Sequence, residues 1–215
     1  SDVCSSDLPR RPAFRTPWQL DQQVGGSDPA DAVELSHTTA QVLVHRGRAA
    51  DDPEVTRRLV ELVDDLGLDA LALLWADRPA RSLPGVLWRL YALRQWVASR
   101  PQEAAREYRD GVLAAEVSHA VAGVVDPPGP QEVHDLVDAT LHGVYTGDLA
   151  VALERAAAFC RVVSAGRGAQ DAPRSEPVHP GGVARDEGAR RGLALLDTAA
   201  DLSAGAVLWR AGQLV

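Results

Sequence analysis

Two Glu-x-x-His motifs are the residues of this chain whose types and spacing could do chemistry. Glu34 and His37 form the first motif, and Glu116 and His119 form the second. Di-iron bundles use two such motifs, together with one glutamate from each of two further helices, and all of these ligands point inward. The motifs therefore raise the hypothesis of a metal-dependent helical enzyme that uses these four residues.

The helical geometry of both motifs argues against a metal site. On a helical wheel Glu34 lies more than about 100° from the apolar stripe around Ala40. Glu116 and His119 lie about 100° and 160° from Val117, which is at the centre of its own stripe. Ligands in a bundle must face its interior, so the pattern favours two solvated Glu/His pairs. The ferritin-like enzyme stays as an alternative, and no cofactor is predicted.

A second candidate metal site lies along one predicted helix. His134, Asp138 and His142 are spaced four residues apart and stack on one edge of that helix. One helix seldom supplies a complete ligand set with its supporting contacts. We therefore expect a charged surface edge at these three residues.

Nucleophilic catalysis has a single candidate, Cys160. This residue falls within an apolar helical stripe and has no histidine at a useful spacing, which is typical of a buried and unreactive thiol. The chain has no phosphate loop, dinucleotide fingerprint, nucleophile elbow or zinc-protease motif. These absences remove the usual grounds for proposing an enzyme.

The elements that would position these residues are all helical. Asp28, Asp52 and Ser82 each precede a proline-containing helix start, and apolar residues recur at helical spacing after each. No alternating strand pattern is present. The sequence predicts one all-α domain of seven or eight helices, orthogonal or bundle-like. We expect an irregular leader at 9–27, a helical domain at 28–165, a flexible loop at 166–183, and a helix at 184–215 that docks through Leu193, Leu196, Ala200 and Val207.

The segment from Ser82 to Arg100 is predicted to be the central helix. Its apolar face leaves Trp88, Tyr91 and Trp96 on the other sides. A helix that is apolar nearly all round is either buried at the centre of a bundle or carries an interface. These three aromatic residues are therefore the predicted contact surface of an interaction protein, provided that they are exposed.

The composition and the ends of the chain indicate its source. The sequence has no Lys, Ile, Asn or Met, a pattern typical of a high-GC genome, and residues 1–8, SDVCSSDL, resemble a translated sequencing adapter. We therefore expect Cys4 to be foreign and the natural start to be missing. The net charge of −8 disfavours nucleic-acid binding, and no membrane span is predicted, so a cytoplasmic protein is expected.

Three stretches carry a resemblance to a family. SLPGVLWRLYALRQWV at 82–97, VAGVVDPPGP at 121–130 and TGDLAVALERAAAFCRVV at 146–163 resemble a helical family, without an assigned role, from high-GC Gram-positive bacteria. Some of its members are labelled RNA polymerase subunit beta. The chain lacks that enzyme's Asp-rich metal loop and is too short for such a subunit, so the resemblance carries over no functional residue.

The sequence thus leaves three functional hypotheses. The first is a non-catalytic helical interaction or scaffold protein that binds a protein partner or a second copy of itself. The second is the metal-dependent helical enzyme. The third, which rests on the family label alone, is an accessory factor of the transcription machinery.

Overall fold

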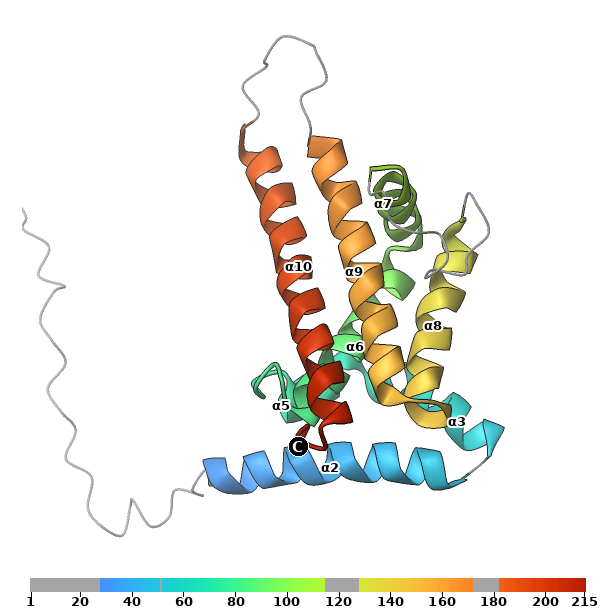
Figure 1. Ribbon diagram of the computed structural model, residues 1–215, viewed down its shortest axis with the longest axis vertical. Coiled ribbons are helices and arrows are strands. Elements are labelled where there is room, and N and C mark those ends of the chain that lie inside the picture. Colours follow the sequence, from blue (N-terminus) through green and yellow to red (C-terminus); the bar gives the residue numbers. More distant parts are fainter. Residues whose placement is uncertain (1–27, 51, 115–127, 172–181) are drawn as a thin grey trace, which may run out of the picture.

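The architecture is all-α, as the sequence predicts. The computed structural model describes residues 28–50, 52–114, 128–171 and 182–215, and within these ranges it has nine helices and no strand (Figure 1). The helices are α2 (Pro29–Ala50), α3 (Pro53–Val60), α4 (Leu62–Leu66), α5 (Leu68–Trp75), α6 (Leu83–Ser99), α7 (Pro101–Ala114), α8 (Pro130–Thr146), α9 (Leu149–Asp171) and α10 (Gly182–Arg210).

Side-chain caps start several of these helices at the predicted positions. The Asp28 carboxylate accepts a hydrogen bond from the Ala30 amide at 2.9 Å, and the Asp52 carboxylate accepts one from the Glu54 amide at 2.9 Å. The Ser82 hydroxyl accepts a hydrogen bond from the Gly85 amide at 3.2 Å. Each cap satisfies a backbone donor that has no partner inside its helix.

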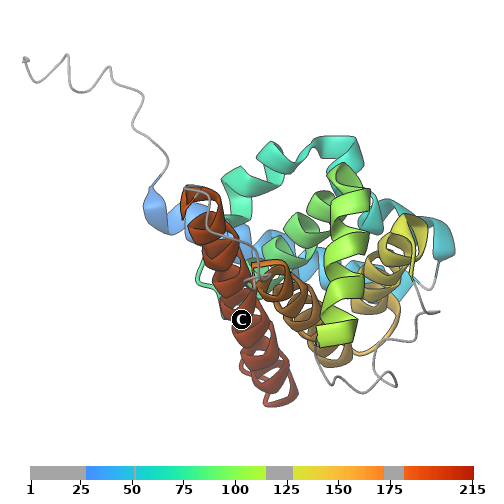
Figure 2. The ribbon, with the colours of Figure 1, turned by 90° about the horizontal axis from the view of Figure 1, so that it is seen from above.

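Helix α6 lies at the centre of the fold. It packs against α2, α5, α8 and α10, and Figure 2 shows it enclosed between them. The buried residues of α6 occur on most sides of the helix: Leu83, Pro84, Gly85, Val86, Leu87, Leu90, Tyr91, Leu93, Arg94 and Val97. The sequence-based expectation of a central helix over this segment therefore matches the packing.

Helices α7 and α9 approach each other closely through glycine. A Cβ atom on Gly111 would lie 1.8 Å from the carbonyl oxygen of Val162, and one on Gly166 would lie 1.9 Å from the carbonyl oxygen of Glu107. The sequence predicted a flexible loop from residue 166. Gly166 instead lies inside α9, as Gly111 lies inside α7, and the crossing of the two helices leaves no room for a side chain at either position.

Helices α9 and α10 run side by side over most of their length (Figure 1). The contact uses small residues of α10: Gly192, Ala199 and Ala206 are buried, as is Leu202. The Ser164 hydroxyl of α9 donates a 2.8 Å hydrogen bond to the carbonyl oxygen of Gly192. The two helices can approach closely because small side chains separate their backbones.

The docking face of α10 differs from the expected one. Leu193, Leu196 and Val207 are 61%, 44% and 64% exposed, and Ala200 is also exposed. We predicted that these four residues would dock, because they form an apolar stripe. The helix is apolar on more than one face, and the face with the smaller side chains is the one that meets α9.

By length and composition alone the segment Arg190–Arg210 would also suffice to cross a membrane.

Candidate functional site

The first candidate metal site, which the sequence argues against, is only partly within the described residues. Glu34 is exposed on α2, and His37 is half-buried one turn later. Glu116 and His119 lie outside the described residues. Within the described part of the chain, no group of three or more His, Cys, Asp or Glu residues is arranged to hold a metal ion.

The second candidate metal site, where the sequence predicts a charged surface edge, contains an ion pair with arginine. Arg94 of α6 is 5% exposed, and its Nε donates a 2.8 Å hydrogen bond to the Asp138 carboxylate. Nη1 of the same guanidinium lies 2.9 Å from the Asp64 carboxylate. Nδ1 of His134 is 3.7 Å from Asp138, while His142 is exposed. The Arg94 guanidinium neutralises the Asp138 carboxylate, which is the carboxylate among the three candidate ligands. Asp138 thus forms an ion pair between α6 and α8.

Cys160 lies on α9 and is fully buried in the core of the protein. Burial in apolar surroundings raises the pKa of its thiol to about 12, although Arg161 and Arg167 act in the opposite direction. A thiol with such a pKa carries almost no thiolate at neutral pH, and the thiolate is the nucleophile. The geometry thus supports the expectation of an unreactive cysteine.

The three aromatic residues of the predicted contact surface differ in their exposure: Tyr91 is buried, whereas Trp88 and Trp96 are partly exposed. Tyr91 is 0% exposed, and its hydroxyl donates a 2.6 Å hydrogen bond to the carbonyl oxygen of Leu59 and pairs with the hydroxyl of Tyr145. Tyr91 is therefore a core residue, and this corrects its assignment to a contact surface. Trp88 and Trp96 are half-buried, so both still present ring surface to solvent.

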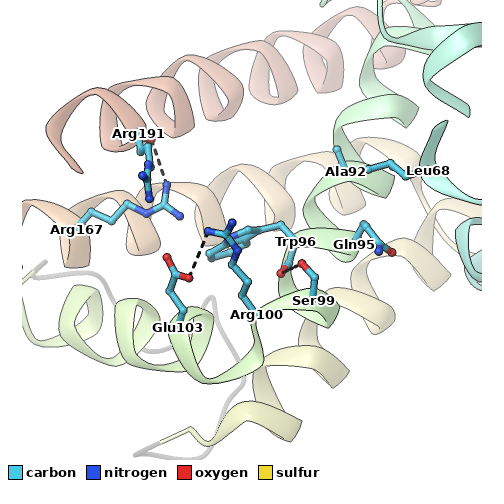
Figure 3. A pocket seen from close by; sticks show the side chains of 9 residues that line it. All are labelled: Leu68, Ala92, Gln95, Trp96, Ser99, Arg100, Glu103, Arg167 and Arg191. Carbon is cyan, nitrogen blue, oxygen red and sulfur yellow. Dashed lines mark hydrogen bonds and ion pairs between the residues drawn. The ribbon is translucent and has the colours of Figure 1, made fainter. Parts of the chain in front are cut away.

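Trp88 and Trp96 line a groove between α6 and α10. One part of the groove, about 550 Å³, is lined by Trp96 and residues of α5, α6, α7, α9 and α10: Leu68, Ala92, Gln95, Ser99, Arg100, Glu103, Arg167 and Arg191 (Figure 3). A second part, about 440 Å³, adjoins it through Ala92, Trp96, Arg167 and Arg191 and is also lined by Ala76, Trp88, Arg89, Leu93, Ala194, Leu195 and Thr198. We call these two parts together the Trp96 groove.

Arg167 forms one wall of the Trp96 groove. Its guanidinium carbon lies 5.1 Å from the centroid of the Trp96 ring, which is a cation–π contact. Its Nε donates a 2.8 Å hydrogen bond to the Glu107 carboxylate, and both side chains are largely buried, at 11% and 8% exposure. Burial raises the pKa of Glu107, and the attraction to Arg167 opposes that change. These contacts hold the Trp96 ring between α6 and α9.

Sequence reasoning found the tryptophans of this groove but missed its arginines. Arg167 follows Gly166 in a stretch that reads as a loop, and its helical position became visible only with the α7–α9 crossing. Arg191 lies on the predicted C-terminal helix, but the docking face expected for that helix, formed by Leu193, Leu196, Ala200 and Val207, does not include it.

No protein-family model, no curated protein and no solved structure matches the chain.

Proposed function

We propose that this protein is a non-catalytic helical interaction protein and that the Trp96 groove is its binding surface. The ligand is a short segment of a partner protein that inserts apolar side chains against Trp88 and Trp96. The observation that carries the proposal is the pair of half-buried tryptophans at an open groove. Tryptophan and arginine are the residues most enriched among those that dominate binding energy at interfaces.

The construction of the groove supports binding more than catalysis. Its lining includes apolar residues such as Leu68, Leu93 and Leu195, and half of its polar residues are arginines. Two of these arginines, Arg89 and Arg167, are held by hydrogen bonds within the protein. Arginine cannot be deprotonated in proteins and so does not serve as a general base. Small apolar sites with a few fixed polar groups are typical of binding clefts.

A peptide-binding measurement tests this function. We would use three Leu-based amphipathic peptides, with Glu, Gln or Lys on the polar face, each carrying an uncharged fluorophore, and measure anisotropy with the purified protein. At least one peptide should bind. Trp96→Ala should weaken that binding about tenfold, which corresponds to about 1.4 kcal/mol.

The chain offers a matched control for this substitution. Trp209 is also half-buried, and the guanidinium carbon of Arg48 lies 5.1 Å from its ring centroid, but Trp209 does not line the groove. Trp209→Ala should leave peptide binding unchanged. The proposed function is wrong if none of the three peptides binds, or if the two tryptophan substitutions weaken binding equally.

A further inference from the structure

Helix α6 forms the floor of the Trp96 groove, and α5 lies along one side of it. Trp88, Ala92 and Trp96 follow one another at four-residue intervals, so they share one side of α6, and all three line the groove. Leu68, at the start of α5, lies beside Ala92 and lines the part of the groove at the C-terminal end of α6 (Figure 3). Ala76, just after α5, lines the part that contains Trp88. Helix α5 therefore runs antiparallel to the floor helix.

Helix α10 lies along the floor helix as well, and it too runs antiparallel to it. A Cβ atom on Gly205 of α10 would lie 2.8 Å from Cγ1 of Val86, near the start of α6. Arg191, earlier in α10, lines the groove together with Trp96, near the end of α6. The groove is thus a trough that has one helix as its floor and helices alongside. This is the layout of a helical bundle in which one position is open.

An extended segment would find few partners for its backbone in this trough. The hydroxyl groups of Ser99 and Thr198 already donate hydrogen bonds to the carbonyl oxygens of Trp96 and Ala194 in their own helices, at 3.0 and 2.9 Å. Within the described ranges there is also no strand whose edge a partner could join. A buried backbone group without a hydrogen bond costs free energy, whereas a helix satisfies most of its backbone groups internally.

We infer that the partner segment binds as an amphipathic α-helix that lies along α6 between α5 and α10. This inference rests on the proposed binding function and adds the conformation of the ligand to it. Apolar residues of the bound helix recur at intervals of three and four, and one of them packs over Ala92, the smallest side chain of the floor, between Trp88 and Trp96.

The length of the floor sets the size of the contact. From Trp88 to Ser99 the floor is about 17 Å long, at 1.5 Å per residue, which equals about three helical turns. A single helix of three turns buries less than the roughly 800 Å² per partner of a standard interface. We therefore expect a reversible complex with a micromolar dissociation constant.

Proline substitutions test the conformation of the ligand separately from the existence of binding. The tightest of the three peptides is compared with two variants, one with proline at a central polar position and one with proline at its first position. Central proline should weaken binding about a hundredfold, because proline breaks a helix in its interior. Proline at the first position should change binding less than about twofold, since a helix tolerates it there.

The outcomes separate this inference from the proposed function. Equal binding of the parent peptide and both proline variants, still dependent on Trp96, would overturn the helical ligand and leave the function standing. Carbon-13 chemical shifts of the labelled parent peptide should become helical on binding, and extended values would likewise overturn the inference. If no peptide binds, the function itself is wrong.

A substitution in the floor locates the bound helix. Ala92→Leu should weaken peptide binding about tenfold, because the longer side chain occupies the space over the floor between the tryptophans. Ala98 of α6 is exposed and lines neither part of the groove, so Ala98→Leu is a control with the same chemical change. Circular dichroism establishes that both variants are folded. Unchanged binding in Ala92→Leu, or an equal loss in the control, would show that the helix does not lie along α6.

Discussion

Gly111 of α7 and Gly166 of α9 are in direct backbone contact. A Cβ atom on Gly166 would lie 2.8 Å from the amide nitrogen of Gly111, and it would come still closer to the carbonyl oxygen of Glu107. The buried Glu107–Arg167 pair joins the same two helices at this crossing. The crossing therefore fixes the wall of the Trp96 groove.

Gly111→Ala should destabilise the protein by about 1–3 kcal/mol, because the new methyl group meets the carbonyl oxygen of Val162 and forces the helices apart. The free energy of unfolding from urea denaturation measures the effect. Gly168 is the control on α9, since it is exposed and a Cβ there meets nothing within 4 Å. Gly168→Ala should stabilise the protein by about 0.5–1 kcal/mol through helix propensity. Equal effects of the two substitutions would contradict the close crossing.

These glycines explain why part of the fold could be predicted and part could not. The caps at Asp28, Asp52 and Ser82 depend on neighbouring residues only, so the sequence is sufficient to predict those helix starts. In the sequence, Gly111 and Gly166 cannot be distinguished from glycines that end a helix. Their role depends on a helix more than fifty residues away along the chain, and no local pattern records that contact.

The candidate site was predictable to a similar extent. The period of α6 separates Trp88 and Trp96 from the core face, but it also separates Tyr91, and only the packed structure shows that α3 and α8 bury the tyrosine. The arginines of the groove come from three helices. Their convergence depends on how those helices pack, which periodicity does not specify.

The two faces of α10 give a direct test of its docking. Leu202→Ala should cost about 2–5 kcal/mol of unfolding free energy, because Leu202 is fully buried and the substitution leaves a cavity. Leu193→Ala should change the unfolding free energy by less than about 0.5 kcal/mol, since Leu193 is exposed. Urea denaturation of both variants decides between the faces. A larger loss for Leu193→Ala would restore the docking face expected from the sequence.

The buried guanidinium of Arg94 predicts unequal roles for its two carboxylates. Asp138→Asn should cost roughly 3 kcal/mol of unfolding free energy, because it removes the better shielded partner of a nearly buried charge. Asp64→Asn should cost less than about 1 kcal/mol, since the Asp64 side chain is half-exposed. Thermal and urea denaturation give both values. If the two variants are equally stable, the ion pair with Asp138 is not the main support of Arg94.

Cys160 should resist thiol reagents in the folded protein. Its pKa of about 12 and its complete burial leave neither thiolate nor access at neutral pH. The measurement is the rate of reaction with Ellman's reagent in a Cys4→Ser background, compared with the same protein in denaturant. We expect a slow reaction when folded and a fast one when unfolded. Fast reaction of the folded protein would show that α9 opens readily or that Cys160 is accessible.

Glu54 should titrate at unusually low pH. Hydrogen bonds from Arg57, at 2.7 and 2.9 Å, and from Arg58, at 3.1 Å, together with the positive charge of both arginines, lower its pKa from 4.5 to about 2. The folded state therefore binds this proton less readily than the unfolded state. The resulting stabilisation is complete above the unfolded pKa of 4.5 and is lost as the pH falls toward 2. The effect is small because the side chains are exposed to solvent.

Carbon-13 NMR of the Glu54 carboxyl group measures this pKa directly. Arg57→Gln should return it most of the way to the ordinary value, because Arg57 supplies the largest of the lowering contributions. In Glu54→Gln, unfolding free energy should fall less steeply than in the wild type between pH 4.5 and 2, since the titrating group is gone. An ordinary pKa for Glu54 in the wild type would mean that the arginine contacts at the start of α3 do not persist in solution.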